Sequence, residues 1–99
     1  MRNIILKFTK KILLCIFLFV FTQNMYSATW YVNDNSTSGD VYCTAIGDNA
    51  NSGLSAALPK LTLAAAITAA ANGDTIYVDT GLYNGTKMTF NKQLTIIGA

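Results

Sequence analysis

The last part of the chain constrains the fold most, because three short runs of alternating apolar residues follow one another there. The apolar side chains occupy every second position, at Ile76 and Val78, at Met88 and Phe90, and at Leu94 and Ile96. Turn-forming residues such as Asn84-Gly85 separate the runs. An alternation with a period of two predicts strands that bury one face. We therefore expect three short strands between residues 73 and 99.

Two arrangements of these strands satisfy the pattern. Ile76 and Leu94 are 18 positions apart (94 − 76), which fits one winding of a three-sided coil of short parallel strands. A small antiparallel meander is the alternative, and periodicity alone does not separate the two. A coil needs further windings to bury its face, so the solenoid interpretation makes this chain an opening, truncated piece of a longer domain.

A single helix is expected before these strands. Pro59 is expected to open the helical stretch, with Thr62 as N-cap, and Asn72-Gly73 to end it. The helix carries one narrow apolar stripe, formed by Leu63, Ile67, Ala70 and Ala71. So short a helix is marginal alone in water, and we expect it to dock on an apolar surface.

The segment before the helix divides into a strand and a long loop. Thr29 to Asn33 reads TWYVN, in which aromatic and β-branched residues favour a short strand. Residues 34–53 are dense in Asn, Asp, Ser and Gly, which favour turns over regular structure. We expect a loop there, with at most a brief strand at Val41 to Thr44.

Residues 1–28 have the organisation of a secretory signal peptide. Four basic residues and no acidic one stand at the start: Arg2, Lys7, Lys10 and Lys11. An apolar run follows over residues 12–21, and then the small Ser27 and Ala28. A membrane span is the alternative, but a span needs about 20 apolar residues and this run is about half that. Cleavage after Ala28 leaves the bulky Tyr26 at the third position before the cut, so the cleaved bond stays open.

Residues 29–99 then form the second region, an exported domain with a net charge of −2, from three lysines and five aspartates. We expect a secreted or cell-surface location and no membrane span once the leader is removed. Cys43 is the one cysteine left, and we expect a buried thiol. A disulfide to a cysteine beyond Ala99 is the alternative.

The chemistry of residues 29–99 is sparse, since they contain no His, Glu or Arg. No two aspartates have a spacing that places them on one face beside an apolar pocket. If any aspartate has a functional role, Asp40 and Asp48 are the first candidates. The loop Asp48–Gly53 matches a calcium loop at its first and sixth positions, but Ala50 offers no oxygen ligand at the third, so we favour an Asx turn. We assign no catalytic, cofactor-binding or metal-binding residue here.

The residues of this region bear on two kinds of partner, sugars and nucleic acids. Four aromatic residues offer rings on which sugars stack: Trp30, Tyr31, Tyr42 and Tyr83. We expect Trp30 and Tyr31 to pack within the domain instead, because aromatics in a small module are usually core. Nucleic-acid binding is not expected, because there is no basic patch or phosphate-binding glycine loop.

The order of these elements resembles the N-terminal region of bacterial secreted right-handed parallel β-helix proteins of the pectate-lyase-like superfamily. The likeness spans residues 29–99 and is carried by the helix running into Asp74 to Val78, the Gly81-x-Tyr83 turn, and Leu94 to Gly98. It departs mainly in a longer insertion around Thr37 to Ile46. The resemblance implies a mainly β fold in which the short strand, polar loop and helix cap the first coil.

The resemblance does not imply one reaction, because that superfamily mixes enzymes, adhesins and structural surface proteins. We expect an exported, surface-associated protein with a structural, adhesive or glycan-binding role, whose partners are polysaccharides or cell-surface glycans. The alternative is the N-terminal part of a polysaccharide lyase on acidic polysaccharides, with its active site beyond residue 99. Calcium is then possible in the longer protein, whereas no cofactor is expected in this segment.

Overall fold

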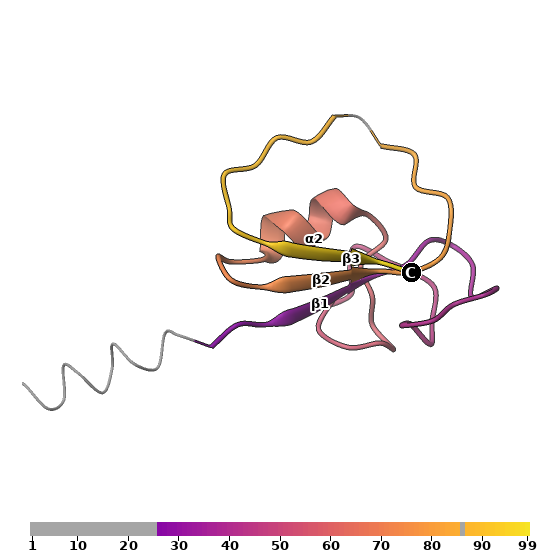
Figure 1. The fold of residues 1–99 in the computed structure, drawn as a ribbon. Coiled ribbons are helices and arrows are strands. Elements are labelled where there is room, and N and C mark those ends of the chain that lie inside the picture. The colour runs from indigo at the N-terminus through magenta and orange to yellow at the C-terminus, as the bar shows by residue number, and fades with distance from the viewer. Residues whose placement is uncertain (1–25, 86) are drawn as a thin grey trace, which may run out of the picture.

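The computed structural model describes residues 26–85 and 87–99, so most of the expected signal peptide lies outside the described residues. It contains four elements (Figure 1), namely β1 Thr29–Val32, α2 Leu63–Ala69, β2 Thr75–Val78 and β3 Thr95–Gly98. The helix of this described part is too short to cross a membrane.

The three strands form one parallel sheet in the order β1-β2-β3. Trp30 lies beside Ile76, which lies beside Ile96. Parallel pairing confirms a mainly β arrangement and excludes the antiparallel meander. The predicted spacing is wrong by two positions, because the register joins Ile76 to Ile96, 20 residues on (96 − 76), rather than to Leu94.

The core lies between α2 and the first two strands, where the helix packs on β1 and β2. Its buried members are all small or branched: Val32, Ala66, Ile67, Ala70 and Ile76. The expected stripe is largely confirmed, since Leu63 is half-buried and Ile67 and Ala70 are buried. Ala71 is exposed instead, because the helix ends before it.

The helix is shorter than predicted at both ends. Thr62 is the N-cap as expected, and its hydroxyl accepts the N–H of Ala65 at 3.2 Å. Pro59 lies outside the helix, in a segment that runs along β1. At the other end Ala70 is already extended, with ψ 155°, so Asn72-Gly73 does not terminate the helix.

Lys92, distant in sequence, caps the C-terminal end of α2. Its ammonium donates to the carbonyl oxygens of Ile67 at 2.7 Å, Thr68 at 3.1 Å and Ala70 at 2.7 Å. A cation at the C-terminus satisfies carbonyls that the helix leaves unpaired and complements the helix dipole. This contact also ties the segment before β3 to the helix.

One predicted strand, at Met88 and Phe90, is wrong. Residues 87–90 form no strand, and Met88 and Phe90 are 41% and 43% exposed. They belong to the long arm that arches from β2 over α2 to β3 in Figure 1. The loop expected over residues 34–53 is confirmed, without even a brief strand at Val41 to Thr44, because a carboxylate binds the N–H groups of residues 41–43.

The two outer edges of the sheet differ. Along β1, the Tyr31 N–H donates to Gly53 O at 2.8 Å, and the Lys60 N–H donates to Tyr31 O at 2.9 Å. The Asn33 N–H in turn donates to Lys60 O at 2.9 Å. The segment at Lys60 therefore closes this edge, as its bridge to Val32 also shows. No strand of the described residues pairs with the outer edge of β3.

Candidate functional site

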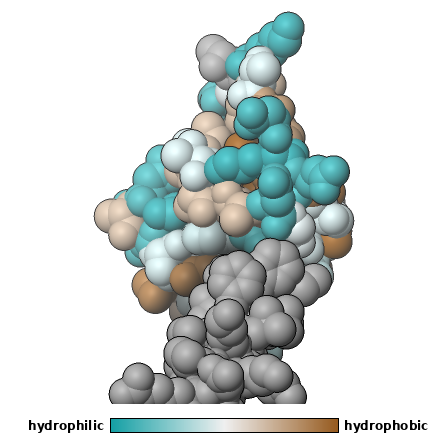
Figure 2. Space-filling model, turned by 90° about the vertical axis from the view of Figure 1, so that its left-hand side faces the viewer, coloured by the Kyte–Doolittle hydropathy of each residue, from teal (hydrophilic) through white to brown (hydrophobic). Residues whose placement is uncertain are grey.

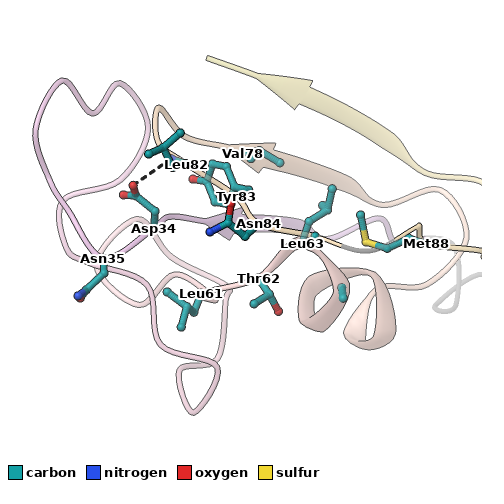
Figure 3. Close-up of a pocket in the computed structure, with 12 residues that line it drawn as sticks. Asp34, Asn35, Leu61, Thr62, Leu63, Val78, Leu82, Tyr83, Asn84 and Met88 are labelled. Carbon is teal, nitrogen blue, oxygen red and sulfur yellow. Dashed lines mark hydrogen bonds between the residues drawn. The ribbon is translucent and has the colours of Figure 1, made fainter.

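A hollow lies between the start of α2, β2 and the arm that follows β2 (Figure 3). Its volume is about 570 Å³, which is within the range of small-molecule sites. The lining is mostly apolar, from Leu61, Leu63, Val78, Leu82 and Met88. Polar groups also line it, namely Asp34, Asn35, Thr62 and Asn84.

Asp34 is the one carboxylate among the lining residues. One of its oxygens accepts the N–H of Ser36 at 3.1 Å and the other accepts the N–H of Leu82 at 3.2 Å, the second drawn in Figure 3. The side chain thus holds the arm to the loop after β1. Retaining and inverting glycosidases both use two carboxyl groups, and the lining residues offer only this one.

Two buried aspartates flank β2. Asp79, directly after the strand, accepts the backbone N–H groups of Val41, Tyr42, Cys43 and Thr80 at 2.6 to 2.8 Å. Burial is the largest single influence on the pKa of Asp79 and would raise it. The four N–H groups together outweigh burial and lower that pKa. Asp79 therefore orders the loop over residues 40–43.

Asp74, directly before β2, is 4% exposed. It accepts the N–H groups of Ala28 at 2.8 Å and Ala71 at 2.9 Å, and the indole N–H of Trp30 at 2.9 Å. The bond from Ala71, then those from Ala28 and Trp30, lower the pKa of Asp74. Both flanking aspartates are ionised anchors of backbone rather than proton donors or acceptors for a substrate.

Asn33, Asp40 and Cys43 form a further polar cluster beside Asp79. The buried Asn33 donates its amide to Asp40 Oδ2 at 2.5 Å and to the carbonyl of Ala45 at 2.8 Å. The other oxygen of Asp40 is buried without a hydrogen-bond partner. Cys43 is a buried free thiol, as expected. Burial, then the charge of Asp79, raises the pKa of Cys43 to about 12, so it is a poor nucleophile.

The loop at Asp48 forms the turn predicted for it. One oxygen of Asp48 accepts the N–H of Ala50 at 2.9 Å, which makes the Asx turn. The next side chain, Asn49, accepts the N–H groups of Leu61 at 2.9 Å and Thr62 at 3.1 Å. The loop is thereby attached to the start of α2, and no metal-binding group was found among the described residues.

The four aromatic candidates for sugar stacking lie in different places. Trp30 and Tyr83 pack against the core, and the Tyr83 hydroxyl donates to Asp79 O at 2.8 Å. Tyr31 stacks on Tyr77 with ring centroids 5.9 Å apart, and Tyr42 lies 4.8 Å from Tyr77. Tyr31 and Tyr42 thus each pack against Tyr77, a tyrosine that the sequence did not single out.

Sequence reasoning missed the roles of Asp74, Asp79 and Lys92. A usable signal was present, because an aspartate stands directly on each side of the TIYV strand, next to turn residues.

The view onto the end of the sheet where β1 begins shows mostly hydrophilic residues with small hydrophobic patches between them (Figure 2). Comparison of the chain with protein-family models, curated proteins and solved structures finds no match.

Proposed function

We propose that residues 29–99 are the N-terminal cap and first winding of a right-handed parallel β-helix in an exported, surface-associated protein. Its role would be structural, adhesive or glycan-binding. The observation that carries this proposal is the asymmetry of the parallel sheet. Its β1 edge is closed by the segment at Lys60, while none of the described residues supplies a partner strand for the β3 edge. A stack closed on one side is suited to begin a solenoid, because its other side accepts the next strand.

The register supports the same proposal. Trp30, Ile76 and Ile96 lie side by side across the three strands, and so do Tyr31, Tyr77 and Ile97. Similar residues stacking in line is the arrangement that successive windings of a solenoid require. Ile96 is 40% exposed, whereas Ile76 is fully buried. A further winding on β3 would place a neighbour beside Ile96, as β3 lies beside Ile76.

Extending the chain by one winding tests the proposal. A duplicate of residues 80–99 appended after Ala99 places a second TIIG strand 20 positions beyond β3, at the spacing that separates β2 from β3. We expect a higher urea midpoint and slower hydrogen exchange at the Ile96 amide, which gains a partner. The matched control lacks one residue of the duplicated arm, which moves its apolar side chains to the other face. Equal effects of the two extensions would contradict the proposal.

An ultraviolet assay for unsaturated sugar products separates this role from the lyase alternative. We expect the exported chain to release none from acidic polysaccharides, with or without calcium, because Asp34, Asp74 and Asp79 are engaged by backbone N–H groups. Cleavage needs convergent, available acid–base groups. Product release by the 99-residue chain itself would contradict the structural role.

A further inference from the structure

Asp74 has a buried negative charge with only uncharged groups bonded to it. Its Oδ1 accepts the N–H of Ala28, and its Oδ2 accepts those of Ala71 and the Trp30 indole. Lys92 is the charged group that also acts on it, but the Lys92 ammonium is bonded to helix carbonyls. A buried carboxylate is costly unless a positive charge compensates it. The closest place for such a charge is the nitrogen of Ala28, 2.8 Å away.

Ala28 is also where the chain joins the fold. Its N–H donates to Asp74, and its carbonyl accepts the N–H of Thr75 at 3.0 Å. Tyr26 and Ser27, directly before it, are exposed, Tyr26 at 89%. The boundary between exposed and attached chain therefore falls between Ser27 and Ala28, inside the region where leader cleavage is expected.

We propose that the mature protein begins at Ala28 and that its new α-ammonium group forms an ion pair with Asp74. This inference rests on the proposed export of the chain. Hydrolysis by the host's leader peptidase adds water across the Ser27–Ala28 peptide bond, which leaves a carboxylate on Ser27 and an ammonium on Ala28. The nitrogen that donates to Asp74 as a neutral amide in the precursor becomes the positive partner of that carboxylate.

The neighbouring cleavage positions do not give this pair. A cut after Ala28 removes both of its hydrogen bonds and leaves Asp74 Oδ1 without its donor. A cut before Ser27 places the ammonium one residue further out, on an exposed residue, and keeps Ala28 as a neutral amide. The geometry thus favours cleavage of the Ser27–Ala28 bond, whereas the sequence does not decide which bond is cut.

The ion pair has a measurable consequence for the amine. An ordinary α-amino group has a pKa near 7.7 to 8.0, and a carboxylate partner raises it. A raised pKa in the folded state means that the stabilisation is complete below about pH 8 and is lost as the pH rises through the raised value. We therefore expect acylation of the Ala28 amine at pH 7 to be about tenfold slower than in Asp74→Asn.

The test is export of the 99-residue chain from a bacterial host, mass spectrometry of its first peptide, and acylation across a pH series. A start at Ala28, with an amine that titrates above pH 8, supports the ion pair. The control Asp48→Asn, an exposed aspartate in the Asx turn, should leave the amine as slow to react as in the unsubstituted protein. The pH series of the unsubstituted protein answers the question even if Asp74→Asn does not fold.

Other results separate this inference from the proposed export. A start at Ser27, Thr29 or Trp30 would overturn the ion pair and leave export intact, whereas recovery of uncleaved Met1 outside the cell would overturn both. A start at Ala28 with an amine that titrates at its ordinary pKa would overturn the pairing alone.

Discussion

The two outer edges of the sheet are formed in different ways, although β1 and β3, the strands at these edges, are equally short. The β1 edge is covered by main chain from residues 53–60, held by hydrogen bonds to Tyr31 and Asn33. The β3 edge is not covered by any strand within residues 26–85 and 87–99. The connections explain the difference, since 46 positions separate Thr29 from Thr75 (75 − 29) but only 20 separate Thr75 from Thr95 (95 − 75). The longer connection provides a closing segment as well as a helix, and the shorter provides only an arm.

A glycine pair gives the largest test of this difference. A Cβ at Gly47 would overlap the carbonyl of Asn33 and come within 2.8 Å of Lys60 O, so there is no room for it on the closed side. A Cβ at Gly98, on β3, would meet nothing within 4 Å. We expect Gly47→Ala to lower the free energy of unfolding by about 3 kcal/mol or more, and Gly98→Ala by less than about 0.5 kcal/mol, in urea titrations. Comparable losses would mean that the closing segment does not pack on β1 as described.

Asp79 offers the next test, because it fixes the loop after β1 from the end of β2. The amide of Asp79→Asn places a donor among N–H groups that need acceptors, and we expect a loss of about 2 to 3 kcal/mol. Because the folded pKa of Asp79 is lowered, its stabilisation is present above the ordinary range near pH 4. It is lost as the pH falls through the folded value.

The measurement for Asp79 is the urea midpoint between about pH 7 and pH 2. The acid loss should be shallower in Asp79→Asn than in the unsubstituted protein, with the remaining slope coming mainly from Asp74, whose pKa is also lowered. An unchanged slope would show that the loop does not depend on this carboxylate.

The smallest expected effect is on the open side, where one side chain attaches the arm to the helix. Lys92→Met removes the cation that binds the carbonyls of Ile67, Thr68 and Ala70. We expect a loss of about 1 kcal/mol, typical of one charged cap at a helix end. The exposed Lys87 in the same arm is the control, and Lys87→Met should leave the urea midpoint unchanged. A loss as large as that of Asp79→Asn would mean that both sides of the sheet are anchored equally.

The elements that depend on local sequence were predicted well. TWYV, TIYV and the Thr62 cap follow from side-chain alternation and from a hydroxyl at the right position, which neighbouring residues alone determine. The run at Met88 and Phe90 has the same alternation, yet it finds no partner strand and arches away from the sheet. Alternation indicates what a strand needs but not whether a neighbour is available to pair with it.

The candidate site was harder to predict because its contacts join distant parts of the chain. Trp30 and Asp74 are 44 positions apart, and Cys43 and Asp79 are 36 apart. The turn residues beside Asp79 mark it as a candidate anchor, but nothing near it in sequence shows that it binds the N–H groups of residues 41–43. The register error had the same origin, since Leu94 and Ile96 have the same local pattern and only pairing with β2 decides between them.

Asp74 and Asp79, on either side of β2, also set an order of folding events, because the chain is synthesised from its N-terminus. Apart from the neighbouring Ala71 and Thr80, the groups they bind lie at Ala28, Trp30 and residues 41–43, which are made long before the aspartates themselves. The first half of the domain therefore lacks its acceptors until residue 79 has emerged. Contacts that close such long loops form late in folding, because the conformational entropy of the loop is lost before the contacts can offset that loss. If the chain is exported as proposed, its first half would still be unfolded when it reaches the membrane.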